Sequence, residues 1–294
     1  MTLEPVGVLG LGVMGGAMSE HLLAAGFPML GFDPAPERRA EHEARGVVVC
    51  GSPAEVAQGA DVVITSLPSA AALLAVLDGA DGLGAGERPD LVIIEASTLS
   101  PETKQDGHDR AQAWGGVLLD CPMSGTGQQA RDGDLIAYLS GAPAAKERAL
   151  PVLRAFTRAQ YDLGAFGQGT RMKLVANLLV AVHNVAAAEA LLLAQRSGLD
   201  LEQVLGAVGD GAGGSRMLQV RGPLMAAGRY ADATATVATM RKDNELIASF
   251  AAGVASPTPL FSAAAVLYQA AVAQDRLDED TACVFGVLQR LAGQ

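Results

Sequence analysis

The chain has 294 residues, of which 50% are hydrophobic and 18% are charged, and its formal net charge at pH 7 is −11. This composition can build buried cores and excludes a disordered protein. The acidic balance argues against nucleic acid and anionic membranes as partners, because both require a basic face on the protein. The length predicts about two domains.

The first predicted elements are a strand, a glycine-rich turn and a helix. An apolar strand at 6–9 leads into a turn, and a helical segment at 17–25 follows. In dinucleotide-binding turns the first glycine permits a tight bend, the second lets a pyrophosphate approach, and the third lets the helix pack on the strand. The helix start offers N–H groups to the phosphates. We therefore predict a cofactor-binding turn, with a plain structural turn as the alternative, made of Gly10, Leu11, Gly12, Val13, Met14 and Gly15.

A second strand, at 28–32, ends at Asp33. The carboxylate of Asp33 can accept hydrogen bonds from both ribose hydroxyls and would repel a 2′-phosphate, which favours NAD over NADP. Arg38 and Arg39 follow closely, so NADP remains an alternative cofactor. An aspartate before Pro34 is also a common turn-forming pair, which is the purely structural interpretation.

Apolar runs and helical segments then alternate along the chain. The runs lie within 61–68, 90–98, 116–120 and 135–140, and helical patterns occupy 53–59, 69–77 and 101–114. This alternation predicts an α/β fold with a mainly parallel, doubly wound sheet of the Rossmann type. Because such sheets bind ligands at the carboxyl ends of their strands, we predict that Leu67, Pro68 and Thr98 line the cofactor groove.

From residue 169 onward the pattern is helical and no strand pattern appears. Helical periods occupy 169–197, 201–208, 215–227, 238–253, 257–274 and 279–292. We therefore predict two domains, 1–166 and 167–294, the second all-helical and joined to the first by one long helix. Polar residues such as Asn177 and Glu189 interrupt that apolar helix, which is typical of a buried globular helix and not of a membrane span.

Lys173 is one of only four lysines, and it lies on this long apolar helix. A buried ammonium is costly unless it is paired or can lose its proton, and a desolvated lysine suits proton transfer. The alternative without a catalytic role is a lysine whose aliphatic chain packs in the core while its ammonium group reaches water. Asn177 follows at i+4 on the same face, so both side chains could touch one oxygen of a small substrate. Asn184 falls near the same stripe.

Two further segments carry polar groups. The loop from Asp120 to Thr126 follows a strand and presents Ser124 and Gly125, whose hydroxyl and backbone N–H suit a carboxylate; an ordinary glycine-rich loop is the alternative. Lys242 belongs to a charged cluster at 241–245, which is usually a solvated face. The histidines fall outside these motifs, and no metal-ligand spacing appears.

The cysteines and the N-terminal residues bear on location. The three cysteines lie far apart in the sequence, at Cys50, Cys121 and Cys283. This spacing predicts reduced thiols that pack in the protein interior. The start of the chain carries an acid and a proline and no basic segment of a signal peptide. A cytoplasmic protein is expected.

Together these motifs resemble the β-hydroxyacid dehydrogenase family, which includes 3-hydroxyisobutyrate dehydrogenase, tartronate semialdehyde reductase and 6-phosphogluconate dehydrogenase. The resemblance spans essentially the whole chain. It rests on the glycine turn at 10–15, on the segment 120–125, on Gly167-Gln168-Gly169 followed by Lys173 and Asn177, and on the late pair Lys242-Asp243.

The resemblance implies roles for these residues. The family's general acid/base matches Lys173, and its substrate-binding amide matches Asn177. Its carboxylate-binding positions match Ser124 and Gly125, with Thr126 beside them, and the position of Lys242 lies near both substrate and nicotinamide. A site in an interdomain cleft and a homodimer or homotetramer are also implied.

Departures from the family pattern concern the substrate pocket. Thr126 and Gln129 replace smaller residues, Ala176 replaces the first of two asparagines, and the segment 274–280 replaces a glycine-rich turn. The family's best-known substrates therefore do not follow by default.

The resulting prediction is an oxidoreductase of class EC 1.1.1. It would transfer a hydride reversibly between a small, carboxylate-bearing 3-hydroxy acid and NAD(P), giving a semialdehyde or keto acid. The alternatives are an imine reductase, which shares the architecture without the lysine, a decarboxylating dehydrogenase, and a non-catalytic NAD-binding sensor.

Overall fold

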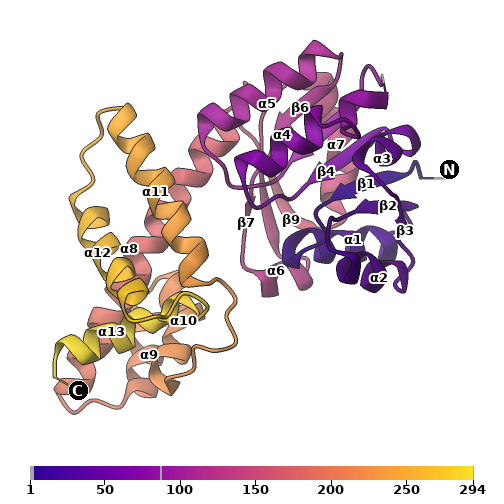
Figure 1. The fold of residues 1–294 in the computed structure, drawn as a ribbon. Helices are drawn as coiled ribbons and strands as arrows, with labels where there is room; N and C mark the ends of the chain where they lie inside the picture. Colours follow the sequence, from indigo (N-terminus) through magenta and orange to yellow (C-terminus); the bar gives the residue numbers. More distant parts are fainter. Residues whose placement is uncertain (1–2, 87, 294) are drawn as a thin grey trace. The chain divides into compact units, whose positions relative to one another are not determined.

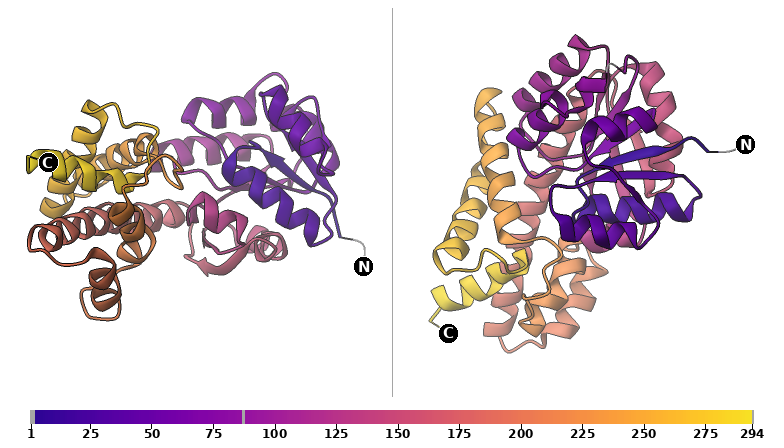
Figure 2. Two further views of the ribbon diagram at one scale, coloured as in Figure 1. Left: turned by 90° about the horizontal axis from the view of Figure 1, so that it is seen from below. Right: turned by 45° about the vertical axis from the view of Figure 1, so that its right-hand side comes forward.

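The computed structural model describes residues 3–86 and 88–293 (Figures 1 and 2). The chain divides into two compact units, Met1–Lys173 and Leu174–Gln294. The first carries a doubly wound parallel sheet and the second is built from helices, as the sequence predicted. One long helix begins in the first unit and continues through the second.

The main sheet has six parallel strands in the order β3-β2-β1-β4-β5-β6. The strands are β1 (Val6–Leu9), β2 (Met29–Phe32), β3 (Val48–Val49), β4 (Val62–Thr65), β5 (Val92–Glu95) and β6 (Val117–Asp120). The connecting helices are α1 (Val13–Ala24), α2 (Pro36–Glu43), α3 (Pro53–Gly59), α4 (Ala70–Asp78), the short η1 (Leu83–Gly86) and α5 (Pro101–Ala113). Strand order reverses at β1, which pairs with β2 on one side and β4 on the other. Ligands of such sheets bind at this point.

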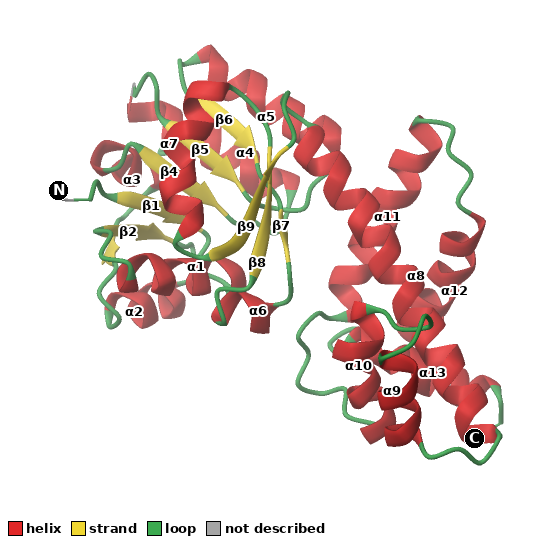
Figure 3. Ribbon diagram, turned by 180° about the vertical axis from the view of Figure 1, so that it is seen from behind, coloured by secondary structure: helices red, strands yellow, loops and turns green. Residues whose placement is uncertain are grey.

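Both faces of the sheet are buried, which explains the continuous apolar runs in its strands. Successive strand residues point to opposite faces. Val6, Val8, Val62 and Ile64 belong to one core cluster with residues of α1 and α7 (Pro143–Arg154), the helix that crosses in front of the strands in Figure 3. Their neighbours in the strands join a second core cluster with α3, α4 and α5, formed in part by Leu9, Val56, Val63, Leu73, Leu77, Ile93 and Ala111.

A separate three-stranded sheet follows the main one. It contains β7 (Met123–Ser124), β8 (Leu135–Leu139) and β9 (Thr157–Asp162), with α6 (Gly127–Arg131) after β7. The predicted run at 135–140 is thus a strand, but it lies in this second sheet, antiparallel to β7 and parallel to β9. The sequence did not indicate β9 because its residues lack an apolar run.

The second unit is formed by most of α8 (Gln168–Arg196) and the helices after it. These are α9 (Leu201–Gly209), α10 (Arg216–Ala227), α11 (Val237–Gly253), α12 (Pro259–Ala273), η2 (Thr281–Cys283) and α13 (Val284–Leu291). Ser215 and Thr236 cap α10 and α11 by accepting a backbone N–H three residues on. α8 is apolar enough to span a membrane by length and composition alone, and its Leu174, Ala181 and Leu191 are core residues of this unit.

A buried ion pair links α10 to η2 in the second unit. Arg221 Nε donates to Asp280 Oδ1 at 3.2 Å, and the other carboxylate oxygen accepts the backbone N–H and the hydroxyl of Thr234. Burial alone would raise the pKa of Asp280, but the charge of Arg221 and the backbone N–H groups hold that pKa below its usual range. The pair therefore stabilises the fold at neutral pH.

We expect Asp280→Asn to lower the free energy of unfolding by about 3–5 kcal/mol at pH 7, because it leaves Arg221 buried without its counter-charge. A carboxylate with a depressed folded pKa stabilises above its unfolded pKa, and that contribution is lost as the pH falls through the folded pKa. The difference from wild type should therefore narrow below about pH 4. Urea unfolding at both pH values tests this, with the exposed Asp278→Asn as control; equal stability at pH 7 would contradict it.

Candidate active site

The glycine turn has no room for larger side chains at two of its positions. Gly10 has φ +93°, and a Cβ there would lie 2.2 Å from the backbone oxygen of Ser66. A Cβ on Gly15 would lie 1.9 Å from the oxygen of Gly10. Gly12 meets only the tip of the Arg38 side chain, at 3.3 Å, and in the described chain no side chain caps α1 there. The first N–H groups of α1 therefore remain available to an anion, and the turn fits a pyrophosphate.

Asp33 lies at the end of β2 beside this turn, and its side chain is buried. Its Oδ2 accepts the backbone N–H of Leu11 at 2.8 Å, and its Oδ1 accepts that of Ala35 at 2.9 Å. Arg38 Nη1 lies 3.5 Å from Oδ2. The structure thus places a carboxylate and a guanidinium together at the position where the sequence predicts the ribose.

The loops after β4 and β5 are tied to each other. Leu67 donates its backbone N–H to Ser97 Oγ at 2.8 Å, and Ser97 donates its own N–H to Glu95 Oε1 at 3.1 Å. Thr65 and Glu95 are register partners at the ends of these parallel strands. The predicted cofactor residues Leu67, Pro68 and Thr98 therefore lie along the carboxyl edge of the same sheet as the glycine turn.

The predicted carboxylate loop begins with β7. Gly125 has φ +148°, and a Cβ there would lie 2.6 Å from the side chain of Leu135. Thr126 caps α6 in a reciprocal arrangement: its hydroxyl accepts the N–H of Gln129, and its own N–H donates to the Gln129 side chain at 3.0 Å. The N–H of Thr126 is thus occupied, whereas its hydroxyl can still donate its hydrogen. Ser124 and Gly125 remain the principal candidates for binding a carboxylate.

Lys173 lies in the second turn of α8, with a relative exposure of 8%. The first turn of this helix is held by side chains of the first unit. Asp120 accepts the backbone N–H of Thr170 at 2.7 Å and its hydroxyl at 2.7 Å. Ser140 Oγ accepts the N–H of Gly169 at 3.0 Å. The sequence predicted a buried lysine on this helix but gave no sign of these anchors.

Asn177 lies one turn further along α8 and is joined to the late charged cluster. Its Nδ2 donates to Asp243 Oδ2 at 2.8 Å, and Lys242 Nζ lies 3.1 Å from Asp243 Oδ1. Asp243 and Asn244 are buried, so this cluster is not a wholly solvated face. Asp243 was missed as a candidate, although its place beside Lys242 could have indicated it. Asn184 instead donates to Tyr268 and to the backbone of Thr281, which makes it a core residue.

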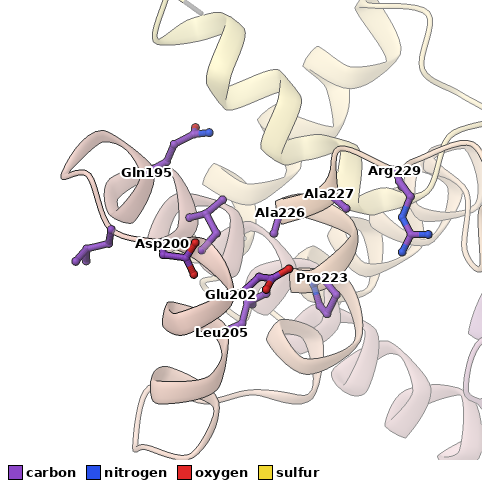
Figure 4. Close-up of a pocket in the computed structure, with 10 residues that line it drawn as sticks. Gln195, Asp200, Glu202, Leu205, Pro223, Ala226, Ala227 and Arg229 are labelled. Carbon is purple, nitrogen blue, oxygen red and sulfur yellow. The ribbon is translucent and has the colours of Figure 1, made fainter.

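The second unit contains two hollows that differ from this site. One, of about 580 Å³, lies between the C-terminal end of α8, α9 and α10 and is lined by residues including Asp200, Glu202, Pro223 and Arg229 (Figure 4). The other, of about 420 Å³, includes His183, Ser215 and Arg216. Among the described residues that line either hollow, none is a predicted site residue.

Two family models together match nearly the whole chain. The NAD-binding domain of 6-phosphogluconate dehydrogenase matches residues 5–167, and the NAD-binding domain of NADP-dependent 3-hydroxyisobutyrate dehydrogenase matches residues 167–288. The chain belongs to the β-hydroxyacid dehydrogenase family. The resemblance carried by its motifs is confirmed, and with it an oxidoreductase that uses NAD; NADP remains open.

Relatives and solved structures agree with this family. The chain is 34% identical to L-threonate dehydrogenase of Cupriavidus necator, covering 96% of this chain and 95% of that protein. It is 31% identical to NAD-dependent L-serine dehydrogenase of Pseudomonas aeruginosa, covering 98% of each. A 3-hydroxyisobutyrate dehydrogenase from Salmonella typhimurium superposes with a TM-score of 0.87 at 31% identity, covering 97% of this chain and 99% of that one. An imine reductase from a Pseudomonas species has 19% identity and a TM-score of 0.65, covering 97% and 99%, and shares the fold.

The glycine turn gives a matched pair of variants. Gly12→Ala should keep the melting temperature, because its methyl group meets only a flexible side chain, yet weaken NADH binding about tenfold or more by blocking close approach of the pyrophosphate. Gly15→Ala should also destabilise the fold by about 1–3 kcal/mol, because its methyl group overlaps a backbone oxygen. Thermal melts and NADH fluorescence titrations distinguish the two; unimpaired NADH binding by Gly12→Ala would argue against the turn as the cofactor site.

Proposed function

We propose that the protein catalyses reversible, NAD-dependent oxidation of a small 3-hydroxy acid to its semialdehyde or keto acid, within class EC 1.1.1, with Lys173 as the general acid/base. The observation that carries this proposal is the placement of Lys173. It is almost fully buried on a helix anchored to the strand that leads into the Ser124 loop, and Asn177 follows one turn later.

Lys173 moves the proton in this mechanism. When bound, NAD supplies a hydride acceptor at its nicotinamide ring. In oxidation the neutral amine of Lys173 removes the hydroxyl proton of the substrate as the carbon-bound hydrogen leaves as hydride. In reduction the protonated amine returns that proton to the forming alkoxide.

Asn177 orients the substrate oxygen. One N–H of its amide is donated to Asp243, which leaves the second N–H for the substrate. Asp243 thereby fixes the amide, and Lys242 balances the carboxylate charge and would lie near substrate and nicotinamide.

The substrate carboxylate is assigned to Ser124 and Gly125, with the hydroxyl of Thr126 as a third donor. The relatives are named for L-threonate, L-serine and 3-hydroxyisobutyrate, which supports short hydroxy acids as the substrate class. The backbone N–H of Thr126 donates to the side chain of Gln129. This N–H is therefore not available to bind the substrate carboxylate.

Two other functions are less well supported. An imine reductase from a Pseudomonas species shares the fold at 19% identity, below the 31–34% identity of the hydroxy acid dehydrogenases. A non-catalytic NAD-binding sensor would not require the buried Lys173 and the Asn177–Asp243 bond. Turnover of NAD with a panel of hydroxy acids separates a dehydrogenase from a sensor.

We also propose a cytoplasmic homodimer or homotetramer. Apolar side chains stay exposed along α8, among them Met172, Val175, Leu179 and Leu193. Exposed apolar stripes of this kind are typical of protein interfaces. The net charge of −11 gives no support to nucleic acid or anionic membranes as partners.

Lys173→Ala should lower kcat about 10²–10⁴-fold, the usual contribution of general acid/base catalysis, and leave NADH binding intact. The assay follows NADH absorbance with short 3-hydroxy acids, and a fluorescence titration controls for cofactor binding. Turnover at the wild-type rate would remove the lysine from the mechanism.

Asp33→Ala should weaken catalysis with NAD about 10- to 100-fold, because it removes a charged hydrogen-bond acceptor for the ribose, and should raise the relative use of NADP. The readout is the ratio of kcat/KM for the two cofactors. An unchanged ratio would mean that Asp33 serves only the glycine turn, through its bond to Leu11.

A further inference from the structure

The first unit contains a fully buried group of three charges. Glu95 and Asp120 are register partners at the carboxyl ends of the adjacent parallel strands β5 and β6. Lys104, from α5, lies between them: its Nζ pairs with the Glu95 carboxylate and is 3.2 Å from Asp120 Oδ1. All three side chains have zero exposure.

Lys104 places a positive charge against both acids at this depth. Two neighbouring buried carboxylates are costly in free energy unless a cation is paired with them. Burial alone would lower the pKa of Lys104, but the charges of Glu95 and Asp120 outweigh it and raise that pKa above its usual range. The amine therefore stays protonated throughout the physiological range.

Asp120 in turn holds the first turn of α8 by hydrogen bonds. Both of its carboxylate oxygens are used by Thr170, one by the backbone N–H and the other by the hydroxyl. The hydroxyl of Ser140 donates a hydrogen bond to Asp120, and its oxygen accepts one from the backbone N–H of Gly169. A Cβ on Gly169 would lie 2.4 Å from the oxygen of Tyr138, so the helix start fits tightly against this unit. Thr170 precedes Lys173 by three residues, less than one turn.

Glu95 is hydrogen-bonded to the loops that are predicted to line the cofactor groove. Its Oε1 accepts the N–H of Ser97 and lies 3.4 Å from the hydroxyl of Thr65. Ser97 in turn holds the N–H of Leu67. One buried lysine thus connects the loops predicted to line the cofactor groove with the first turn of the helix that carries Lys173.

We propose that Lys104 and Asp120 are positioning residues for the reaction: the group Glu95–Lys104–Asp120 sets the position of Lys173 against the cofactor loops, by holding the first turn of α8 through Thr170. Neither residue touches the reacting atoms. The proposal rests on the proposed role of Lys173 and adds to it a device that fixes its position.

The test compares Lys104→Met, Asp120→Asn and Thr170→Val with wild type in the full-length enzyme. Each should lower kcat, about 10- to 100-fold for the first two, because small displacements of a catalytic group have effects of this size. The pH at which kcat is half-maximal should also move. NADH affinity should be retained in Asp120→Asn and Thr170→Val, because the glycine turn, Asp33 and the bonds from Ser97 to Glu95 and from Leu67 to Ser97 are left in place.

Two control variants separate positioning from stability. Thr170→Ser keeps both bonds to Asp120 and should have wild-type kcat and pH profile. Lys146→Met removes another buried lysine of the same unit, paired with Asp162, and should lower the melting temperature without changing the pH profile. If Lys104→Met does not fold, the Thr170→Val and Thr170→Ser pair decides.

Wild-type kcat and pH profile in both Lys104→Met and Thr170→Val would overturn the proposal and reduce the group to a stabilising network. Lys173→Ala, measured alongside, distinguishes failure of the positioning proposal from failure of the proposed role of Lys173. If that variant is inactive while the network variants are unaffected, only the positioning role fails. If it remains active, the role of Lys173 fails and the positioning proposal fails with it.

Discussion

The buried carboxylate of Asp120 is the interaction on which the candidate site depends. A helix that starts inside a protein leaves its first N–H groups without partners in the helix, and these groups must be satisfied from outside. Asp120 and Ser140 do this for Thr170 and Gly169. Asp120 has zero exposure, and Lys104 supplies the opposite charge 3.2 Å from its Oδ1. The location of Lys173 follows from where this first turn is held.

The same logic extends along the carboxyl edge of the sheet. Asp33 holds the N–H of Leu11, Ser97 holds that of Leu67, and Asp120 holds that of Thr170. In each case a short side chain at a strand end fixes a backbone group of another segment. Backbone fixed in this way keeps its position while a ligand binds, which is what electrostatic preorganisation requires. The candidate site is therefore built on backbone groups that side chains hold by hydrogen bonds.

Local patterns predicted the fold, whereas the pairings within the site needed tertiary structure. The glycine turn and the helices α8 to α12 were predictable because apolar period, glycine positions and caps such as Ser215 act within a few residues. β9 was not predicted because its sequence contains no apolar run. The bonds from Asn177 to Asp243 and from Thr170 to Asp120 join residues 66 and 50 positions apart. Spacing alone cannot indicate such pairs, although the resemblance did indicate Lys242.

The most direct test of the account is a crystal structure of the dead-end complex with NADH and a 3-hydroxy acid substrate. The account predicts that Lys173 Nζ and Asn177 Nδ2 both lie about 2.6–3.2 Å from the substrate hydroxyl, whose carbon approaches the nicotinamide ring to about 3–3.5 Å. It also predicts that Asp120 still holds Thr170. A complex in which the amine of Lys173 faces bulk water, away from both substrate and nicotinamide, would contradict the account.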